Sequence, residues 1–257
     1  MQLYPSFNDI PHTSGSVVTV GTFDGVHLGH QALLRALVDD AHTRGLPSAV
    51  VTFYPHPRVV LGRAPASYLT LPEEKARQLQ SLGVDILVQL AFTRETIQTT
   101  AAEFVHLMLE HLRMVSLWIG PDFALGNRRQ GDAAYLRAQG IENGFAVNVL
   151  APVNAGVESI SSTRIRAALA RGDMGDVQLC LGRPFCVSGI VADGVKIHVA
   201  RQQAVPVAGT YGVQVCGERY QAAVYSTDGT DHVMELDRPI RCDQTVATST
   251  VVEFNHG

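Results

Sequence analysis

The stretch Gly21-Thr22-Phe23-Asp24-Gly25-Val26-His27-Leu28-Gly29-His30 decides how the fold of this 257-residue chain is predicted. An apolar run at 17–20 precedes it, and a segment with apolar residues at helical spacing follows it at 33–41. This order predicts a buried strand, a glycine-rich turn and an amphipathic helix. Glycines let the backbone approach a ligand closely, and the N–H groups of a helix N-terminus attract an anion. The stretch therefore predicts a phosphate site.

The composition limits what kind of protein this is. The net charge of −4 argues against a general nucleic-acid-binding protein, which usually presents a basic face, so any anion site must be local. No apolar run reaches the roughly 18–20 residues that span a bilayer, and the N-terminus lacks a basic-then-apolar signal. The four cysteines form no C-x-x-C pair, which favours reduced thiols. We expect a cytoplasmic protein of unknown oligomeric state, without nucleic-acid or membrane partners.

The first part of the chain alternates strand and helix signals. The five predicted strands are buried apolar runs at 17–20, 48–53, 85–90, 115–119 and 146–150. Pro72 opens a predicted helix to about residue 82, and Thr100 with Glu103 forms the capping box of another. This alternation predicts an α/β fold with a Rossmann-like, five-stranded parallel sheet, covered by helices on both faces. We assign this domain to residues 1–182.

Polar loops follow several of these strands. They occupy 21–30, 52–57 and 120–131, and a further polar segment at 160–166 begins another helix. In parallel sheets, ligands bind beyond the carboxyl ends of the strands, where such loops meet. We expect the four segments to form one site.

Helical periodicity stops after residue 182. Short alternating segments replace it at 185–191, 195–199, 212–215, 220–225, 232–236 and 246–254. Turn residues separate these segments, which is typical of a small antiparallel barrel or sandwich. Residues 183–257 are therefore predicted to form a second, all-β domain.

The first loop lacks the two commonest phosphate motifs. There is no G-x-x-x-x-G-K-[ST] and no G-x-G-x-x-G, so neither a Walker-type ATPase nor a dinucleotide redox fold is indicated. His27 and His30 can instead donate to phosphate oxygens beside a helix N-terminus, and so stabilise charge without a covalent intermediate. Two alternatives are open on the residues alone: a zinc site that includes His56, and a tight connection without function.

Several motifs, in order, carry a resemblance to a known family. The stretch at 21–30 resembles the G-x-F-D-G-x-H-x-G-H signature of the bacterial bifunctional riboflavin kinase/FAD synthetase family, within the H-x-G-H nucleotidylyltransferase superfamily. Residues 52–57 resemble T-F-x-P-H-P, residues 120–131 resemble G-x-D-F-x-F-G-x-x-R-x-G, and residues 160–166 resemble I-S-S-T-x-I-R. Residues 181–185 resemble the domain junction. The similarity covers about residues 15 to 190, and Leu125 departs from the family's second phenylalanine.

The resemblance implies roles for particular residues. The implied reaction is adenylyl transfer from Mg²⁺-ATP to FMN, giving FAD and pyrophosphate, with no metal ligand from the protein and no tightly bound cofactor. The implied catalytic residues are His27, His30 and Arg166. ATP would be bound by Gly21, Phe23, Asp24, Gly25, His27, Gly29, His30, Ser162, Thr163 and Arg166. The flavin side would be formed by Thr52, Pro55, His56, Pro57, Asp122, Phe123, Asn127 and Arg129.

The second domain departs from the family pattern. The family's barrel phosphorylates riboflavin and carries a G-F-P-T-A-N signature that binds Mg²⁺-ATP, and this chain lacks it. We therefore expect FMN adenylyltransferase activity without riboflavin kinase activity. The alternatives are a bifunctional enzyme whose kinase site uses Gly194, Lys196 and His198, a nucleotidylyltransferase for another phosphorylated substrate, and a flavin- or nucleotide-binding regulator without catalysis.

Overall fold

The chain folds into two compact units in the computed structural model. The structure describes all residues except 12–13, 64, 157, 228–230, 241–248 and 255–257. One unit comprises Met1–Pro65 and Pro72–Val153, and the other comprises Ala66–Leu71 and Asn154–Gly257. The main division between the compact units thus follows Val153. The boundary between an adenylyltransferase domain and a kinase-like barrel, expected at 182–183, stays a prediction.

The first unit contains a parallel six-stranded sheet. Its strands are β1 (Gln2–Tyr4), β2 (Ser16–Val20), β3 (Ser48–Tyr54), β4 (Ile86–Ala91), β5 (Met114–Ile119) and β6 (Ala146–Val149). They lie in the order β1-β4-β3-β2-β5-β6, and every neighbouring pair is parallel. The five predicted strands are all present. The prediction missed β1, because a three-residue strand at a sheet edge, with Gln2 and Leu3 exposed, carries no readable alternation.

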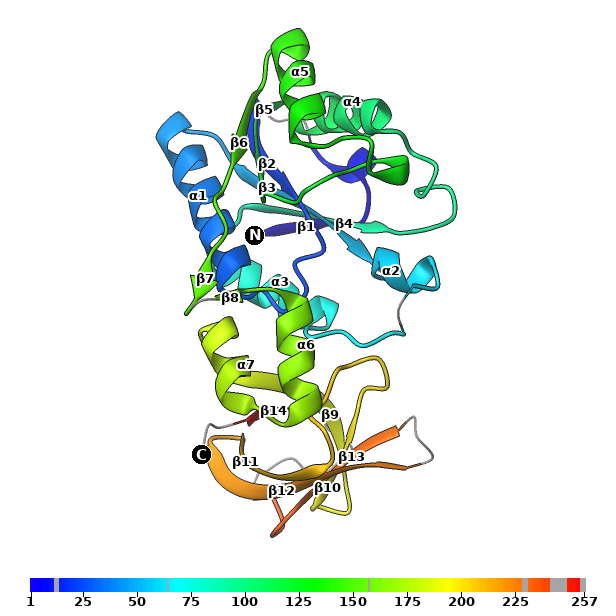
Figure 1. Cartoon of the computed structure of the whole chain (residues 1–257), viewed down its shortest axis with the longest axis vertical. Coiled ribbons are helices and arrows are strands. Elements are labelled where there is room, and N and C mark those ends of the chain that lie inside the picture. Colours follow the sequence, from blue (N-terminus) through cyan, green and yellow to red (C-terminus); the bar gives the residue numbers. More distant parts are fainter. Residues whose placement is uncertain (12–13, 64, 157, 228–230, 241–248, 255–257) are drawn as a thin grey trace. The chain divides into compact units, whose positions relative to one another are not determined.

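Helices cover both faces of this sheet (Figure 1). The unit's helices are α1 (Leu28–Arg44), α2 (Pro57–Val60), α3 (Pro72–Ser81), α4 (Ala101–Leu112) and α5 (Ala133–Asn143), with 3₁₀ turns η1 (Phe7–Asp9) and η2 (Asn127–Arg129). Val17, Val50 and Leu87 pack with apolar residues of α1 and α3. Val18, Ala49 and Val88, on the opposite face, pack with residues of α4 and α5. The capping box predicted for α4 is present.

The second unit combines two helices with a closed barrel. It contains β7 (Asn154–Ala155), β8 (Glu158–Ser159), α6 (Ser162–Arg171), α7 (Met174–Leu181), β9 (Phe185–Ala192), β10 (Lys196–Val199), β11 (Gly209–Val215), β12 (Glu218–Thr227), β13 (Asp231–Leu236) and β14 (Ser249–Phe254). The barrel order is β10-β13-β12-β11-β14-β9, and β9 pairs with β10 to close it. Of the alternatives barrel and sandwich, the structure shows the barrel. Part of the segment predicted at 246–254 lies outside the described residues.

One cysteine contradicts the expectation of reduced thiols. Cys216 is disulfide-bonded, whereas Cys180 and Cys186 are free. Cys242 lies outside the described residues.

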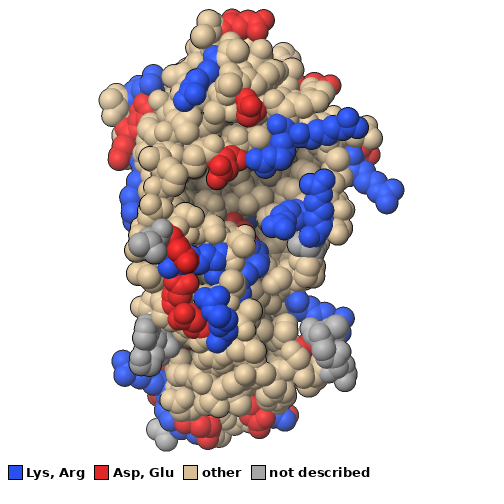
Figure 2. Space-filling view, viewed as in Figure 1, with Lys and Arg blue, Asp and Glu red and all other residues tan. Residues whose placement is uncertain are grey.

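The face of the molecule shown in Figure 2 carries charges of both signs. Figure 2 shows Lys and Arg side chains interspersed with Asp and Glu on the displayed face. Across the part of the chain that the structure describes, no helix is both long and apolar enough to cross a bilayer.

Candidate active site

The sequence motifs of the first unit lie where the strand order of the sheet reverses. The chain builds outward from β2 through β3 and β4, and then returns to place β5 on the other side of β2. In open parallel sheets, the crevice at the carboxyl ends of two such strands is the preferred ligand site. The loops after β2 and β5 are the motif segments at 21–27 and 120–131, and the segment at 52–57 follows the neighbouring β3.

The turn after β2 has an unusual backbone. Phe23 and Val26 have φ of 47° and 39°, and Gly25 has φ of 88°. Positive φ is strained for non-glycine residues, above all for a β-branched valine, so the surroundings must hold this turn. Both side chains are buried, and a Cβ on Gly21 would lie 2.9 Å from the Phe23 ring. The apolar core thus fixes the turn from beneath.

The two histidines of the turn are in direct contact. His27 caps α1, because its Nδ1 accepts a hydrogen bond from the His30 N–H at 3.3 Å. A neutral His27 therefore carries its proton on Nε2. The two imidazole rings stack with their centroids 3.6 Å apart, and the Phe23 ring meets that of His30 edge-on at 5.2 Å. The helix N-terminus and both rings thus form one anion-attracting surface.

The surroundings of His30 favour its neutral form. Burial, together with the charges of His27 and Lys75, lowers the pKa of His30 well below its usual 6.5. Its Nδ1 atom is buried and makes no hydrogen bond with the described residues. A bound phosphate would favour the protonated ring, because an opposite charge raises the pKa of a histidine.

Lys75 belongs to this site and was missed in the sequence. It lies on α3, is 5% exposed, and donates from Nζ to the Thr22 carbonyl oxygen at 2.6 Å. Burial lowers the pKa of Lys75 to about 8, although the charge of Asp24 opposes this shift. The available signal was helical spacing, since Lys75 lies four residues before the buried Leu79 on the same face of α3.

The segment predicted for the flavin side after β3 divides into two parts. Thr52 is completely buried, and its hydroxyl donates to the Thr22 carbonyl at 3.3 Å, so it supports the first loop from within the sheet. Pro55 is exposed, and His56 and Pro57 are half-buried. His56 caps α2 through its Nδ1, which accepts from the Arg58 N–H at 3.0 Å. The predicted loop therefore ends in a short helix that begins at Pro57.

The loop after β5 is held against the start of α4. Leu125 and Gly131 exchange two backbone hydrogen bonds of 3.1 and 3.0 Å, and Leu125 is buried in the core. The Asn127 N–H donates to the Thr99 carbonyl at 2.8 Å.

The predicted flavin residues of this loop differ in exposure. Phe123 packs against the core, while Asp122 and Arg129 are exposed and Asn127 is half-buried. The Arg129 guanidinium donates to the Asp122 carbonyl at 2.7 Å. Three of the four side chains at this strand end are thus polar and reach solvent.

The remaining predicted ATP residues belong to the second unit. Ser161 caps α6, and Ser162 and Thr163 are the first residues of this helix. Arg166 donates to the Ser67 carbonyl at 3.2 and 3.0 Å and to the Ser162 carbonyl at 3.2 Å. Arg164 has a different role, since it forms an ion pair with Asp176 at 2.5 Å.

Two further features bear on binding. Among the described residues, no group of three or more His, Cys, Asp or Glu side chains could hold a metal ion.

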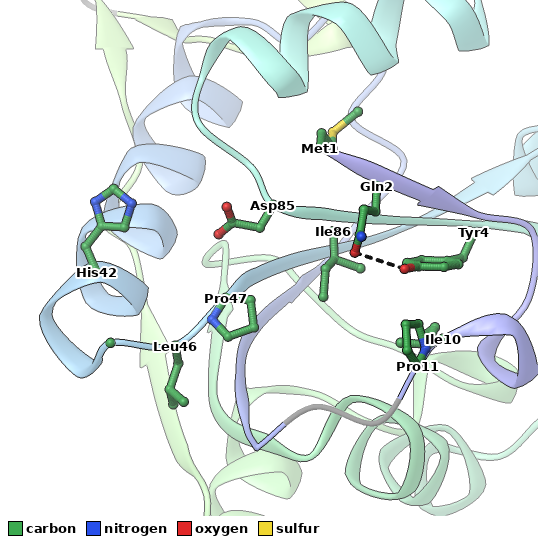
Figure 3. Close-up of a pocket in the computed structure, with 11 residues that line it drawn as sticks. Met1, Gln2, Tyr4, Ile10, Pro11, His42, Leu46, Pro47, Asp85 and Ile86 are labelled. Carbon is green, nitrogen blue, oxygen red and sulfur yellow. Dashed lines mark hydrogen bonds between the residues drawn. The ribbon is translucent and has the colours of Figure 1, made fainter.

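A pocket of about 680 Å³ lies at the opposite, amino-terminal end of the sheet, lined by residues that include Tyr4, His42 and Asp85 (Figure 3). None of the residues that line it comes from the motif loops.

The comparisons with known proteins identify the family of this chain. A parallel α/β unit with histidines at the first strand–helix turn defines the nucleotidylyltransferase-like class. The family profile described as FAD synthetase matches residues 9–164. The chain belongs to the FAD synthetase family, and it contains an FMN adenylyltransferase domain.

Its relatives include proteins named bifunctional riboflavin kinase/FMN adenylyltransferase. That of Escherichia coli K12 is 38% identical over 79% of this chain and 69% of its own. That of Listeria monocytogenes is 35% identical over 77% and 67%. A solved structure from Streptococcus pneumoniae, titled a macrolide-efflux protein, is 26% identical, with a TM-score of 0.81 over 99% of this chain and 89% of that one.

Proposed function

We propose that this chain transfers the adenylyl group of ATP to FMN and does not phosphorylate riboflavin. In this reaction an FMN phosphate oxygen forms a bond to the α-phosphorus of ATP, and the bond to pyrophosphate breaks. The products are FAD and pyrophosphate, and no protein nucleophile is required. The observation that carries the proposal is the stacked pair of His27 and His30 at the N-terminus of α1, within the segment matched by the FAD synthetase family.

The residues of the turn would act on the phosphates of ATP. The glycine-containing backbone at 21–25 would let the nucleotide lie close to the main chain. His27 would donate a hydrogen bond from Nε2 to a phosphate oxygen. His30 would gain a proton as the phosphate binds and would stabilise the charge that develops on the phosphoryl oxygens. Ser162, Thr163 and Arg166 would bind the β- and γ-phosphates, as hydroxyls and a guanidinium at a helix start can.

Mg²⁺ would enter with the nucleotide. The described residues offer no cluster of carboxylates or histidines for a resident ion. The oxygen atoms of the ATP triphosphate would therefore be the ligands of Mg²⁺. The chemistry it would supply is neutralisation of phosphate charge. Pro55, His56, Pro57, Asp122, Phe123, Asn127 and Arg129 would form the flavin side, with Thr52 supporting the first loop rather than contacting flavin.

The barrel supports the proposed loss of kinase activity. The chain between β10 and β11 lacks G-F-P-T-A-N, and the segment found there is packed into the second unit. Gln203 is 1% exposed; its side chain accepts from the Ser188 N–H at 2.9 Å and donates to the Cys186 carbonyl at 3.1 Å. A segment fixed to β9 in this way is not free to fold over a triphosphate.

Two parallel assays test both halves of the proposal. The purified chain is incubated with Mg²⁺-ATP and either FMN or riboflavin, and FAD, pyrophosphate, FMN and ADP are measured. We expect FAD and pyrophosphate from FMN, and neither FMN nor ADP from riboflavin. The bifunctional enzyme of E. coli, assayed alongside, would show that the kinase conditions are adequate.

Each assay has its own contrary result. FMN and ADP formed from riboflavin would establish the bifunctional alternative, which the names of the relatives favour. Binding of FMN and ATP without pyrophosphate release would instead support a regulator without catalysis.

A further inference from the structure

Lys75 and the turn after β2 are joined at a single oxygen atom. The Thr22 carbonyl accepts a hydrogen bond from the Lys75 ammonium at 2.6 Å and another from the Thr52 hydroxyl at 3.3 Å. Thr22 directly precedes Phe23, the first residue of the turn with positive φ. A charge-assisted hydrogen bond is roughly twice as strong as a neutral one. The ammonium is therefore placed to fix the peptide at which the strained turn begins.

The position of this lysine is costly for the fold. A buried ammonium loses its hydration, and Lys75 is 5% exposed. The charged and titratable groups of this cluster are Asp24, whose charge favours the ammonium, and the histidines His27 and His30. The pKa of His30 is lowered by burial first, and then by the charges of His27 and Lys75. A hydrophobic residue four positions before Leu79 would complete the apolar face of α3 without this cost. Perturbed ionisable groups of this kind cluster at functional sites.

We propose that Lys75 is a positioning residue of the adenylyl-transfer site: its ammonium holds the Thr22 carbonyl and keeps the turn in the shape that presents His27 and His30 to the phosphates of ATP. This inference rests on the proposed function. It adds to the site a residue on α3, a helix to which the sequence motifs assign no site residue. Lys75 itself contacts the turn, not the reacting atoms.

The composition of the chain makes the state of Lys75 directly measurable. The sequence contains only two lysines, Lys75 and Lys196. The full chain labelled with ¹³Cε-lysine therefore gives two side-chain NMR signals, and the variants Lys75→Arg and Lys196→Arg assign them. We expect the Lys75 signal to titrate near pH 8 and to move to higher pH when Mg²⁺-ATP is added. A Lys75 signal that titrates like a free lysine, near 10.4, and does not respond to Mg²⁺-ATP would overturn the proposal.

The second test compares pH–rate profiles of FAD formation. In the wild type we expect kcat/KM for ATP to fall several-fold between pH 7 and pH 9, because Lys75 loses its proton in this range. Lys75→Arg keeps its charge, so we expect no decrease over the same range. Lys75→Met should lose at least ~10-fold at pH 7, mainly in kcat, since a positioning residue acts on the charge developing in the transition state. Circular dichroism establishes that each variant is folded.

The two tests separate this proposal from the proposed function. If the wild type forms no FAD, the proposed function fails, while the NMR titration and its response to ATP still decide the state of Lys75. If FAD is formed and the wild-type profile is flat from pH 7 to pH 9, the proposal is overturned, even where the arginine variant does not fold. An unchanged kcat in folded Lys75→Met would overturn it as well.

Discussion

Replacing His30 with alanine is expected to reduce kcat for FAD formation at least ~10²-fold. Loss of one preorganised hydrogen-bond donor at an oxyanion typically costs ~10²–10³-fold in kcat. The buried and unpaired Nδ1 of His30 indicates that this ring is arranged for a ligand and not for the stability of the fold. The measurement is steady-state release of pyrophosphate with FMN and Mg²⁺-ATP.

The matched control for this prediction is His106→Ala. His106 lies on α4, where its side chain is 76% exposed and forms only an i,i+4 pair with Glu110. Such exposed pairs contribute at most a few tenths of a kcal/mol, so the control should keep wild-type rates. A folded His30→Ala protein with a near-normal kcat would show that the role assigned to this histidine is wrong.

The sequence predicted most of the fold because its elements carry strong periodic signals. The strands around Val17, Val50 and Leu117 are mostly buried, and therefore appear as largely apolar runs between helices with readable starts. The element that escaped, β1, has no such signal. The choice between barrel and sandwich depended on the pairing of β9 with β14, which joins segments far apart in sequence.

The candidate site was predicted less completely than the fold. The glycine- and histidine-containing loops were identifiable because their residue types are rare together, and topology brings those of the first unit to one sheet edge. Lys75 was not, because a lysine after two glutamates is typical of a solvated helix face. The spacing of four residues between Lys75 and Leu79 was the one available sign of the burial that the packing of α3 shows. Thr52 shows the reverse case, since a motif residue proves to lie inside the sheet.

Replacing Gly126 with alanine is expected to lower the free energy of unfolding of the first unit by about 3 kcal/mol. Gly126 has φ of 76° and ψ of 172°, a region that is essentially restricted to glycine and costs other residues ~1–3 kcal/mol. An alanine Cβ would also lie 2.4 Å from the backbone nitrogen of Ala101, at the start of α4. Backbone atoms cannot move aside as a flexible side chain can, so overpacking adds ~1–3 kcal/mol.

The matched control is Gly45→Ala. Gly45 also has positive φ, 64°, but an added Cβ would meet nothing within 4 Å. The control therefore isolates the strain of a left-handed residue, about 1 kcal/mol. Urea unfolding followed by the fluorescence of Trp118, the only tryptophan of the chain, reports on the first unit because this residue lies in β5.

The difference between the two glycine variants tests whether the loop after β5 is rigid. If Gly126→Ala is no less stable than Gly45→Ala, the loop moves away from α4 at little cost, and the arrangement of Asn127 beside Thr99 is not fixed by the fold. If the expected difference is found, the backbone itself holds Asn127 and Arg129 in place. The surviving folded fraction of Gly126→Ala should then show a raised KM for FMN, because both residues belong to the proposed flavin side. An unchanged KM would place the flavin elsewhere.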